Sequence, residues 1–304
     1  MQIHHTIAGI RHALQQISDE PPGASSQAVS SLEVGSQKPD LALVPTMGAL
    51  HEGHLSLVRA ARRAAQTVAV SIFVNPTQFA PHEDFSLYPR TLESDCALLE
   101  REGVDLVFAP SAEEMYPPGA SSTFVEVPGI GDRLDGASRP GHFRGVATVV
   151  AKLFNITQPD LAFFGQKDAA QVAVLRAMVR DLNLPVELRI CPTVRDPDGL
   201  ALSSRNRFLS PAERTSALAL SRALKHAQSL VEAGADRRVV LPIMLDILKS
   251  TPKSCAALRL DYLEIVDPHT LLPNPTARPP VLIAVAAWAV TTRLIDNIVI
   301  GDPS

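Results

Sequence analysis

LALVPTMGALHEGHLSLVRAARRAAQTVAVSIFV, residues 41–74, contains the pattern of a strand, a helix and a second strand in succession. Leu41–Val44 is a continuous apolar run and Val68–Val74 is interrupted only by Ser71; such runs are typical of strands in a sheet that is covered on both faces. Between them, Leu55, Leu57 and Val58 are the apolar positions of a helix. Short connections between these elements predict a parallel sheet with crossover helices.

The same alternation continues along the chain to about residue 190. Further strands are expected at Val104–Ala109, Leu161–Phe164 and Val186–Ile190, and further helices at 91–101, 145–156 and 171–180. The segment Ser18–Pro39 is rich in Ser, Pro, Gly and Gln and has no apolar periodicity. We expect it to be a mobile surface loop between a first short helix and the first core strand.

After about Val194 the order of the elements changes. Ser210-Pro211-Ala212-Glu213 is a capping box with Pro at the first helical position, and it opens a helix to about Glu232. A helix at 237–249 and three strand-like runs follow, at Leu260–Val266, Val281–Ala287 and Arg293–Ile300. The sequence therefore predicts an α/β chain with a first domain over residues 1–193 and a smaller α+β domain over 194–304.

Composition limits the class of protein. The 304 residues include 28 Lys and Arg against 32 Asp and Glu, a net charge of −4, which argues against a general nucleic-acid binder. The longest apolar run, residues 281–290, is about half of what a membrane-spanning helix needs, and the amino terminus does not resemble a secretory signal. Three widely spaced cysteines suggest neither a disulfide framework nor a zinc site. We expect a soluble cytoplasmic protein that does not bind membranes.

The turn after the first core strand has the features of a phosphate site. Gly48 and Gly53 allow close backbone approach to a ligand, and a helix amino terminus favours anions. His51 and His54 are three residues apart, so both can reach one phosphate. The spacing is not that of the HExxH zinc motif, and two surface histidines without a function are an alternative explanation.

Polar side chains also follow other strands of the predicted sheet. Lys167 and Asp168 come after one strand. Lys167 either contacts a phosphate or only forms a salt bridge with Asp168. Asn75 and Gln78 follow a second strand. Ser203-Ser204-Arg205-Asn206 is a candidate polyanion clamp, although by itself a polar turn is the simpler explanation. Because the carboxyl ends of parallel strands share one edge, we expect a common site there.

Seven motifs resemble the pantothenate synthetase (pantoate–β-alanine ligase) family, in its order and spacing. They are PTMGALHEGH (45–54), SIFVNPTQF (71–79), DFSLYPRTLESD (84–95), RPGHFRGV (139–146), FFGQKDAAQ (163–171), DGLALSSRNRFL (198–209) and TRLIDN (292–297). The resemblance implies a Rossmann-like amino-terminal domain, a carboxyl-terminal domain that closes as a lid, and a homodimer. It also implies ATP- and Mg²⁺-dependent condensation of pantoate with β-alanine through a pantoyl-adenylate, which yields pantothenate, AMP and pyrophosphate.

The resemblance also implies roles for individual residues. The residues that match the family's ATP-binding stretches are Met47, Gly48, Ala49, Leu50, His51, Glu52, Gly53, His54, Gly165, Gln166, Lys167, Asp168, Val194, Leu202, Ser203, Ser204 and Arg205. The expected catalytic residues, which contact phosphates or stabilise charge on them, are His51, His54, Lys167, Ser203 and Arg205, with His54 at the position usually called the proton donor. Gln78, Gln171 and Arg139 match substrate-binding positions, and Asp95 lies near the family's magnesium site.

Two other hypotheses remain at this stage. One is a related nucleotidyltransferase that moves AMP or CMP onto a phosphate; Gln78 and Gln171 argue against it, because a phosphate acceptor calls for more positive charge. The other is a nucleotide-binding module without catalysis. The presence of both histidines together with Lys167 and Arg205 argues against that class.

Overall fold

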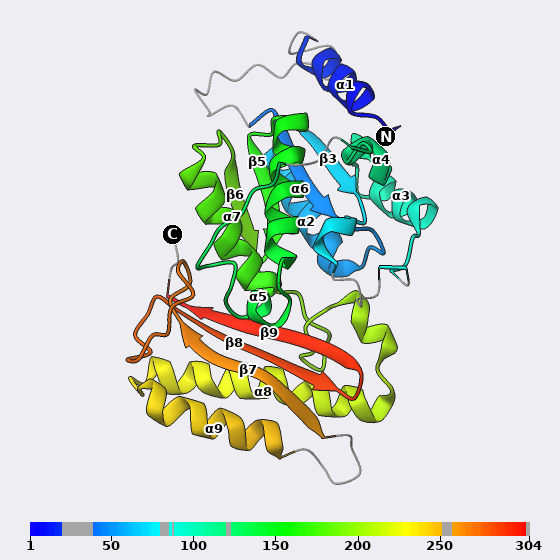
Figure 1. Ribbon diagram of the computed structural model, residues 1–304. Coiled ribbons are helices and arrows are strands. Elements are labelled where there is room, and N and C mark those ends of the chain that lie inside the picture. Colours follow the sequence, from blue (N-terminus) through cyan, green and yellow to red (C-terminus); the bar gives the residue numbers. More distant parts are fainter. Residues whose placement is uncertain (20–38, 80–84, 87, 120–122, 251–256, 302–304) are drawn as a thin grey trace, which may run out of the picture.

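Two sheets organise the chain, as the computed structural model shows for residues 1–19, 39–79, 85–86, 88–119, 123–250 and 257–301 (Figure 1). The first sheet has six parallel strands in the order β1-β4-β3-β2-β5-β6, and the second has three antiparallel strands in the order β7-β8-β9. The first six strands are β1 (Gln2–His4), β2 (Leu41–Thr46), β3 (Thr67–Ile72), β4 (Leu106–Phe108), β5 (Leu161–Gly165) and β6 (Glu187–Cys191). The remaining three are β7 (Leu258–Val266), β8 (Val281–Ala289) and β9 (Thr292–Ile300).

Helices cover both faces of the parallel sheet. The longer ones in this half are α1 (Ile7–Asp19), α2 (Glu52–Ala64), α3 (Leu92–Arg101), α6 (His142–Thr157) and α7 (Ala169–Asp181). Along β2, Leu41 and Leu43 pack with α1, α6 and α7, whereas Ala42 and Val44 pack with α2 and α3. Successive strand residues point to opposite faces, so apolar side chains at every position are what a doubly covered sheet requires.

The antiparallel sheet is also covered on both faces. On one side it packs against α8 (Pro211–Glu232) and α9 (Arg237–Lys249), with Ile283 and Val285 in this core. On the other side, Leu282 and Ala284 join the core of the first sheet. Strand β8 is therefore buried along almost its whole length, and the two halves of the chain are packed together rather than joined only by a linker.

Short helical turns follow three of the strands and precede two of the helices. These are η1 (Pro76–Gln78) after β3, α4 (Ala112–Met115) after β4, α5 (Asp135–Ser138) before α6, η2 (Gln166–Asp168) after β5, and η3 (Ser204–Phe208) before α8. Three of them, η1, η2 and η3, carry candidate site residues. None of the helices in the described part of the chain is long and apolar enough to cross a bilayer.

The predicted fold class is confirmed, and the differences lie at element boundaries. The parallel sheet and the carboxyl-terminal α+β arrangement are as expected, and the helix 237–249 has the predicted bounds. Strand β3 ends at Ile72 rather than Val74, and α6 begins at His142 rather than Gly145, because Gly141, with φ +81°, caps it. The three-residue edge strand β1 was not predicted. Residues 20–38 of the expected loop lie outside the described residues, and Ser18 and Asp19 belong to α1.

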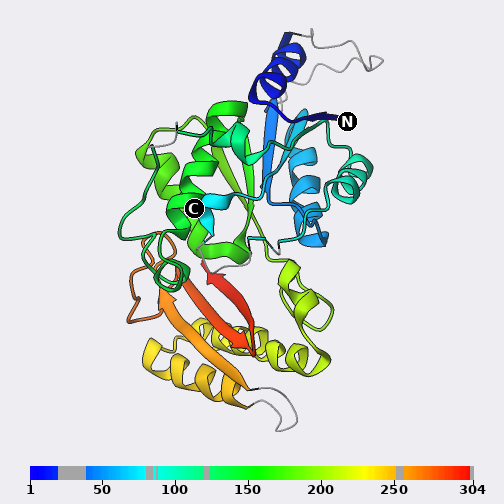
Figure 2. The same cartoon turned by 45° about the vertical axis from the view of Figure 1, so that its right-hand side comes forward.

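The order of the strands identifies the edge where a ligand binds. Strand β2 leads to β3 on one side, whereas β5 pairs on its other side, so the chain connections diverge between β2 and β5. Ligands of open α/β sheets bind at such a switch point, outside the carboxyl ends of the strands. Both ribbon views show these ends directed toward the antiparallel sheet (Figures 1 and 2). The predicted boundary at 193/194 falls between β6 and this second half, and it stays a prediction.

Candidate active site

A buried carboxylate shapes the turn between β2 and α2. Asp95, 2% exposed on α3, accepts hydrogen bonds from the backbone N–H groups of Ala49 (2.9 Å) and Leu50 (2.9 Å). The hydroxyl of Thr91 donates a third bond to the same carboxylate at 3.0 Å. Asp95 therefore holds the turn that leads into the histidines. Its assignment as a magnesium ligand stays a prediction, and this packing does not favour it.

Glycine is required at the start of this turn. Gly48 has φ +82°, and a Cβ placed on it would lie 3.0 Å from Oδ2 of Asp95 and 3.1 Å from a methyl carbon of Ile72. Ala49 follows with φ +51°. The turn is thus a tightly packed left-handed segment, and its backbone passes close to the carboxyl end of β3.

His51 and His54 form a reciprocal cap at the amino terminus of α2. Nδ1 of His51 accepts from the backbone N–H of Gly53 (3.1 Å), and Nδ1 of His54 accepts from the backbone N–H of His51 (3.3 Å). The two ring centroids are 4.1 Å apart. Gly53 has to be glycine here, because a Cβ would lie 2.9 Å from Cε1 of His51. Since each Nδ1 accepts a bond, each neutral ring carries its proton on Nε2.

The environment keeps both imidazoles neutral. Burial, followed by the neighbouring His51, lowers the pKa of His54 to about 3. Burial, followed by the charge of Lys167, lowers the pKa of His51 as well. Two neutral Nε2–H groups are therefore available as hydrogen-bond donors at pH 7, whereas proton donation by a His54 imidazolium is not expected in this state.

The turn after β5 places a cation next to the histidines. Nζ of Lys167 is 3.4 Å from Oδ1 of Asp168, and both charges act on His51. Burial would raise the pKa of Asp168, but Lys167, Arg205 and His142 together lower it. Asp168 is therefore ionised at neutral pH. Gly165, the last residue of β5, has open space where a Cβ would be.

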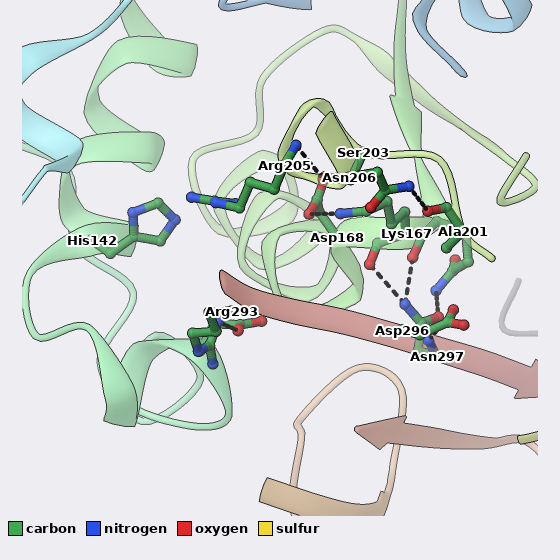
Figure 3. A network of polar contacts seen from close by, with 12 residues as sticks. His142, Lys167, Asp168, Ala201, Ser203, Arg205, Asn206, Arg293, Asp296 and Asn297 are labelled. Atoms are coloured by element: carbon green, nitrogen blue, oxygen red, sulfur yellow. Dashed lines mark hydrogen bonds and ion pairs between the residues drawn. The ribbon is translucent and has the colours of Figure 1, made fainter. Parts of the chain in front are cut away.

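The segment from Val194 to Arg205 approaches the same place from the second half. The backbone N–H of Leu202 donates to the carbonyl of Val194 at 2.9 Å, and Oγ of Ser203 accepts from the backbone N–H of Arg205 at 3.3 Å. Figure 3 shows the Arg205 side chain extending toward His142, which lies at the start of α6. Ser204 also shares a hydrogen bond with the hydroxyl of Tyr88, whose pKa is raised by burial.

A small hollow lies next to some of these groups, between the two halves of the chain. Its lining includes Lys167 after β5, Ser203, Arg205 and Asn206 near η3, and Arg293 of β9. Arg293 is paired with two carboxylates, so the cations of this hollow that favour an anionic ligand are Lys167 and Arg205. The charge of these side chains suits the phosphates of a nucleotide.

A second group of residues is organised around Gln78. This side chain is 9% exposed; its Oε1 accepts from Nδ2 of Asn75 (3.1 Å), and its Nε2 contacts the sulfur of Met47 (2.9 Å). Nδ1 of His142 donates to the carbonyl of Gln78 at 2.8 Å, so Nε2 of that ring accepts from Arg139 at 3.1 Å. Helix α6 approaches closely because Gly145 has no Cβ, which would lie 2.4 Å from the carbonyl oxygen of Thr77.

The structure brings most predicted residues to this edge; the roles given to Asp95 and Gln171 stay predictions. Asp95 lies behind the turn after β2 rather than in the hollow, and Gln171 is half-buried on α7 without a hydrogen bond to the other predicted residues. Sequence reasoning missed the roles of Tyr88, His142 and Asn297. All three lie in motifs that were noticed, YPR, RPGHFRGV and TRLIDN, but only the fold shows what their side chains contact.

Comparison with known proteins gives one consistent result. A family model described as pantoate-beta-alanine ligase matches residues 16–299. A pantothenate synthetase from Acidobacterium capsulatum is 55% identical over 304 residues, covering 99% of this chain and 98% of that protein. A pantothenate synthetase from Thermotoga petrophila is 54% identical over 272 residues, covering 89% and 95% of the two chains.

Solved structures agree with the sequence comparison. The pantothenate synthetase from Thermus thermophilus is similar with a TM-score of 0.87 and 45% identity, covering 99% of this chain and 100% of that chain. A pantoate-beta-alanine ligase from Francisella tularensis, complexed with beta-gamma ATP and beta-alanine, has a TM-score of 0.74 and 31% identity, with full coverage of both chains.

Proposed function

The chain belongs to the pantoate-beta-alanine ligase family, and from this premise we propose how its residues carry out the reaction. It is an ATP-dependent ligase that condenses pantoate with β-alanine to pantothenate. The observation that carries the assignment of its residues is that two neutral histidine donors at the switch point of the sheet lie within electrostatic reach of Lys167, which lines one hollow together with Arg205.

In the first step, a carboxylate oxygen of pantoate attacks the α-phosphorus of ATP, and the bond to the bridging oxygen of pyrophosphate breaks. Negative charge grows on the phosphoryl oxygens. Nε2–H of His51 and of His54 donate to these oxygens, and Lys167 and Arg205 balance the charge of the leaving pyrophosphate. Ser203 orients the backbone at Arg205 through its 3.3 Å cap.

In the second step, the amine of β-alanine attacks the acyl carbon of the pantoyl-adenylate. The bond from that carbon to the bridging oxygen breaks, AMP leaves, and the amine releases a proton. Gln78 and Arg139 hold the substrates next to the adenylate, with His142 between them. A neutral amide recognises hydroxyl and carboxylate groups without adding charge.

We also propose that residues 194–304 act as a lid. The acyl-adenylate hydrolyses if water reaches it, so a closed site protects it. The hollow is already lined from both halves of the chain: Ser203, which caps η3, and Arg205 and Asn206 of η3 come from the second half. Movement of η3 toward the first half would cover a bound nucleotide.

Magnesium is the remaining component that the family resemblance implies. Asp95 is buried with its oxygens bonded to backbone N–H groups and Thr91, and no cluster of three His, Cys, Asp or Glu side chains occurs among the residues that the structure describes. Mg²⁺ is often bound mainly by nucleotide phosphates and water. We therefore expect it to arrive with ATP, and no step above depends on it. A homodimer and a cytoplasmic location are supported by the family resemblance alone.

Pyrophosphate exchange tests the proposed chemistry. The protein is incubated with Mg·ATP and labelled pyrophosphate, with and without pantoate, and without β-alanine. Label that enters ATP only when pantoate is present supports reversible adenylate formation. Folded protein that binds ATP but shows no pantoate-dependent exchange would contradict the two-step mechanism.

A further inference from the structure

A buried asparagine of the second sheet contacts the turn that carries Lys167. Asn297 on β9 is 4% exposed. Its Nδ2 donates to the backbone carbonyls of Gln166 (3.0 Å) and Lys167 (2.8 Å), and its Oδ1 accepts from Nε2 of Gln166 (3.2 Å; Figure 3). Both N–H groups and the oxygen of this carboxamide therefore form hydrogen bonds with the three-residue turn η2.

The turn has little else to fix it. It is a single 3₁₀ turn between β5 and α7, and no side chain caps its start. Two small hollows, both lined by Lys167 and by residues of β9, lie beside it. The orientation of the Lys167 backbone therefore depends strongly on the bonds from Asn297.

The preceding residue ties a second segment to the same strand. Asp296, 3% exposed, forms a bidentate ion pair with Arg195, at 2.6 and 2.9 Å. Oδ1 of Asp296 also accepts from the backbone N–H of Asn297 at 2.8 Å. Arg195 begins the segment that continues to Ser203 and Arg205. Two adjacent residues of β9 thus fix the position of the turn that carries Lys167 relative to the segment that carries Arg205.

We propose that Asn297 is a positioning residue for the adenylation step, an inference that rests on the proposed function. By fixing two carbonyls of the turn, it holds Lys167 at the place where its ammonium meets the phosphates of ATP. Asn297 itself contacts no reacting atom. A small displacement of a charged group weakens transition-state stabilisation far more than it weakens the fold.

Two substitutions and one control test this role. Asn297→Ser shortens the side chain so that it cannot bond both carbonyls, and leaves room for water. Asn297→Asp places an oxygen opposite the two carbonyl oxygens. The control is Asn274→Asp, because Nδ2 of Asn274 also donates to a backbone carbonyl, that of Arg278 at 3.1 Å, in the β7–β8 connection. For each variant, pantoate-dependent pyrophosphate exchange, equilibrium binding of ATP and the melting temperature are measured.

We expect kcat/KM for ATP in the exchange reaction to fall about 10- to 100-fold in Asn297→Ser, with more loss in Asn297→Asp. The KM for pantoate stays at the wild-type value, and Asn274→Asp behaves like the wild type. If Asn297→Asp does not fold, Asn297→Ser carries the test. Wild-type ATP parameters in Asn297→Ser would overturn the inference. Equal changes in ATP and pantoate parameters that follow the melting temperature would also overturn it, since they indicate a purely structural role. Exchange by the wild-type enzyme in the same assay tests the proposed function separately.

Discussion

At the scale of single residues, the reactive character of the site comes from hydrogen bonds that select one tautomer. His51 and His54 give their Nδ1 atoms to backbone N–H groups at the start of α2, which leaves both Nε2–H groups as donors. The motif HEGH specifies this arrangement locally. His51 caps the helix, His54 lies one turn later, and Gly53 leaves room for the ring of His51. Two imidazoles in this state donate to phosphate without carrying charge.

Removing one of these donors should reduce catalysis without unfolding the chain. In His54→Ala, we expect pantoate-dependent exchange to fall about 10²-fold or more, the effect typical of a lost electrostatic group in an active site. Circular dichroism and ATP binding monitor the fold. The matched control is His226→Ala, an exposed histidine on α8. Near-normal exchange in His54→Ala would refute the role given to this residue.

The neutral state of His54 also predicts an acid sensitivity of the fold. Its pKa is about 3 in the folded chain, whereas the ordinary value is 6.5, so below pH 6.5 the unfolded chain binds a proton that the folded chain does not. The contribution of the neutral His54 to the free energy of unfolding is fully present above pH 6.5 and is lost as the pH falls toward 3. Between pH 6.5 and 5 the loss is at most about 2 kcal/mol.

Urea unfolding at pH 7 and pH 5 measures this effect. The free energy of unfolding should fall more in the wild type than in His54→Ala over this interval, because the variant lacks the titrating group. Asp168, whose pKa is lowered, does not contribute here, since its stability is lost only below about pH 4. An identical pH dependence of both proteins would show that His54 is not buried in its neutral form.

At the scale of elements, the close approach between α6 and η1 positions Gln78, whose carboxamide we propose to bind the substrate. A Cβ on Gly145 would lie 2.4 Å from the carbonyl oxygen of Thr77 and 2.7 Å from Cα of Gln78. Gly145→Ala must therefore push η1 away from α6. We expect the KM for pantoate to rise about tenfold while ATP binding is unchanged. Steady-state kinetics with each substrate varied in turn measure this, and an unchanged KM for pantoate would contradict the placement of Gln78.

The elements themselves were largely predictable, because their signals are local. The continuous apolar strands predicted a doubly covered parallel sheet, and Ser210 with Glu213 predicted the start of α8. The edge strand β1 has only three residues and no apolar run, so its pairing with β4 depends on the tertiary fold. In the site, HEGH and Lys167 could be recognised from the sequence. The buried packing of Asp95 and the bonds of Asn297 could not, because they join segments 45 or more residues apart.

At the scale of the whole molecule, charged side chains hold the two halves together beside the site. Arg293 of β9 is paired with Asp135 of α5 (2.7 Å) and with Asp261 of β7 (2.7 Å), and its side chain is 14% exposed. Asp135 also accepts from the hydroxyl of Tyr262 at 3.2 Å. The second sheet therefore docks through an ion-pair network, of which Asp135 is buried, in addition to its apolar face.

Breaking this network should destabilise the chain. Arg293→Met keeps an unbranched apolar stem but leaves two carboxylates without their cation. We expect the free energy of unfolding to fall by about 3 kcal/mol, because an uncompensated buried charge is costly. Urea denaturation monitored by circular dichroism measures the change. Unchanged stability would mean that Asp135 and Asp261 are solvated and that the two halves are held by apolar packing alone.

The central claim is that pantoate is activated by direct attack of its carboxylate on the α-phosphorus of ATP. Pantoate with ¹⁸O in both carboxylate oxygens tests it most directly, in a reaction with ATP and β-alanine followed by mass spectrometry of the AMP. Because the attacking oxygen stays on phosphorus when the amine displaces AMP, the mechanism predicts a single ¹⁸O atom in each AMP. Pantothenate formed together with AMP that contains no ¹⁸O would contradict the pantoyl-adenylate.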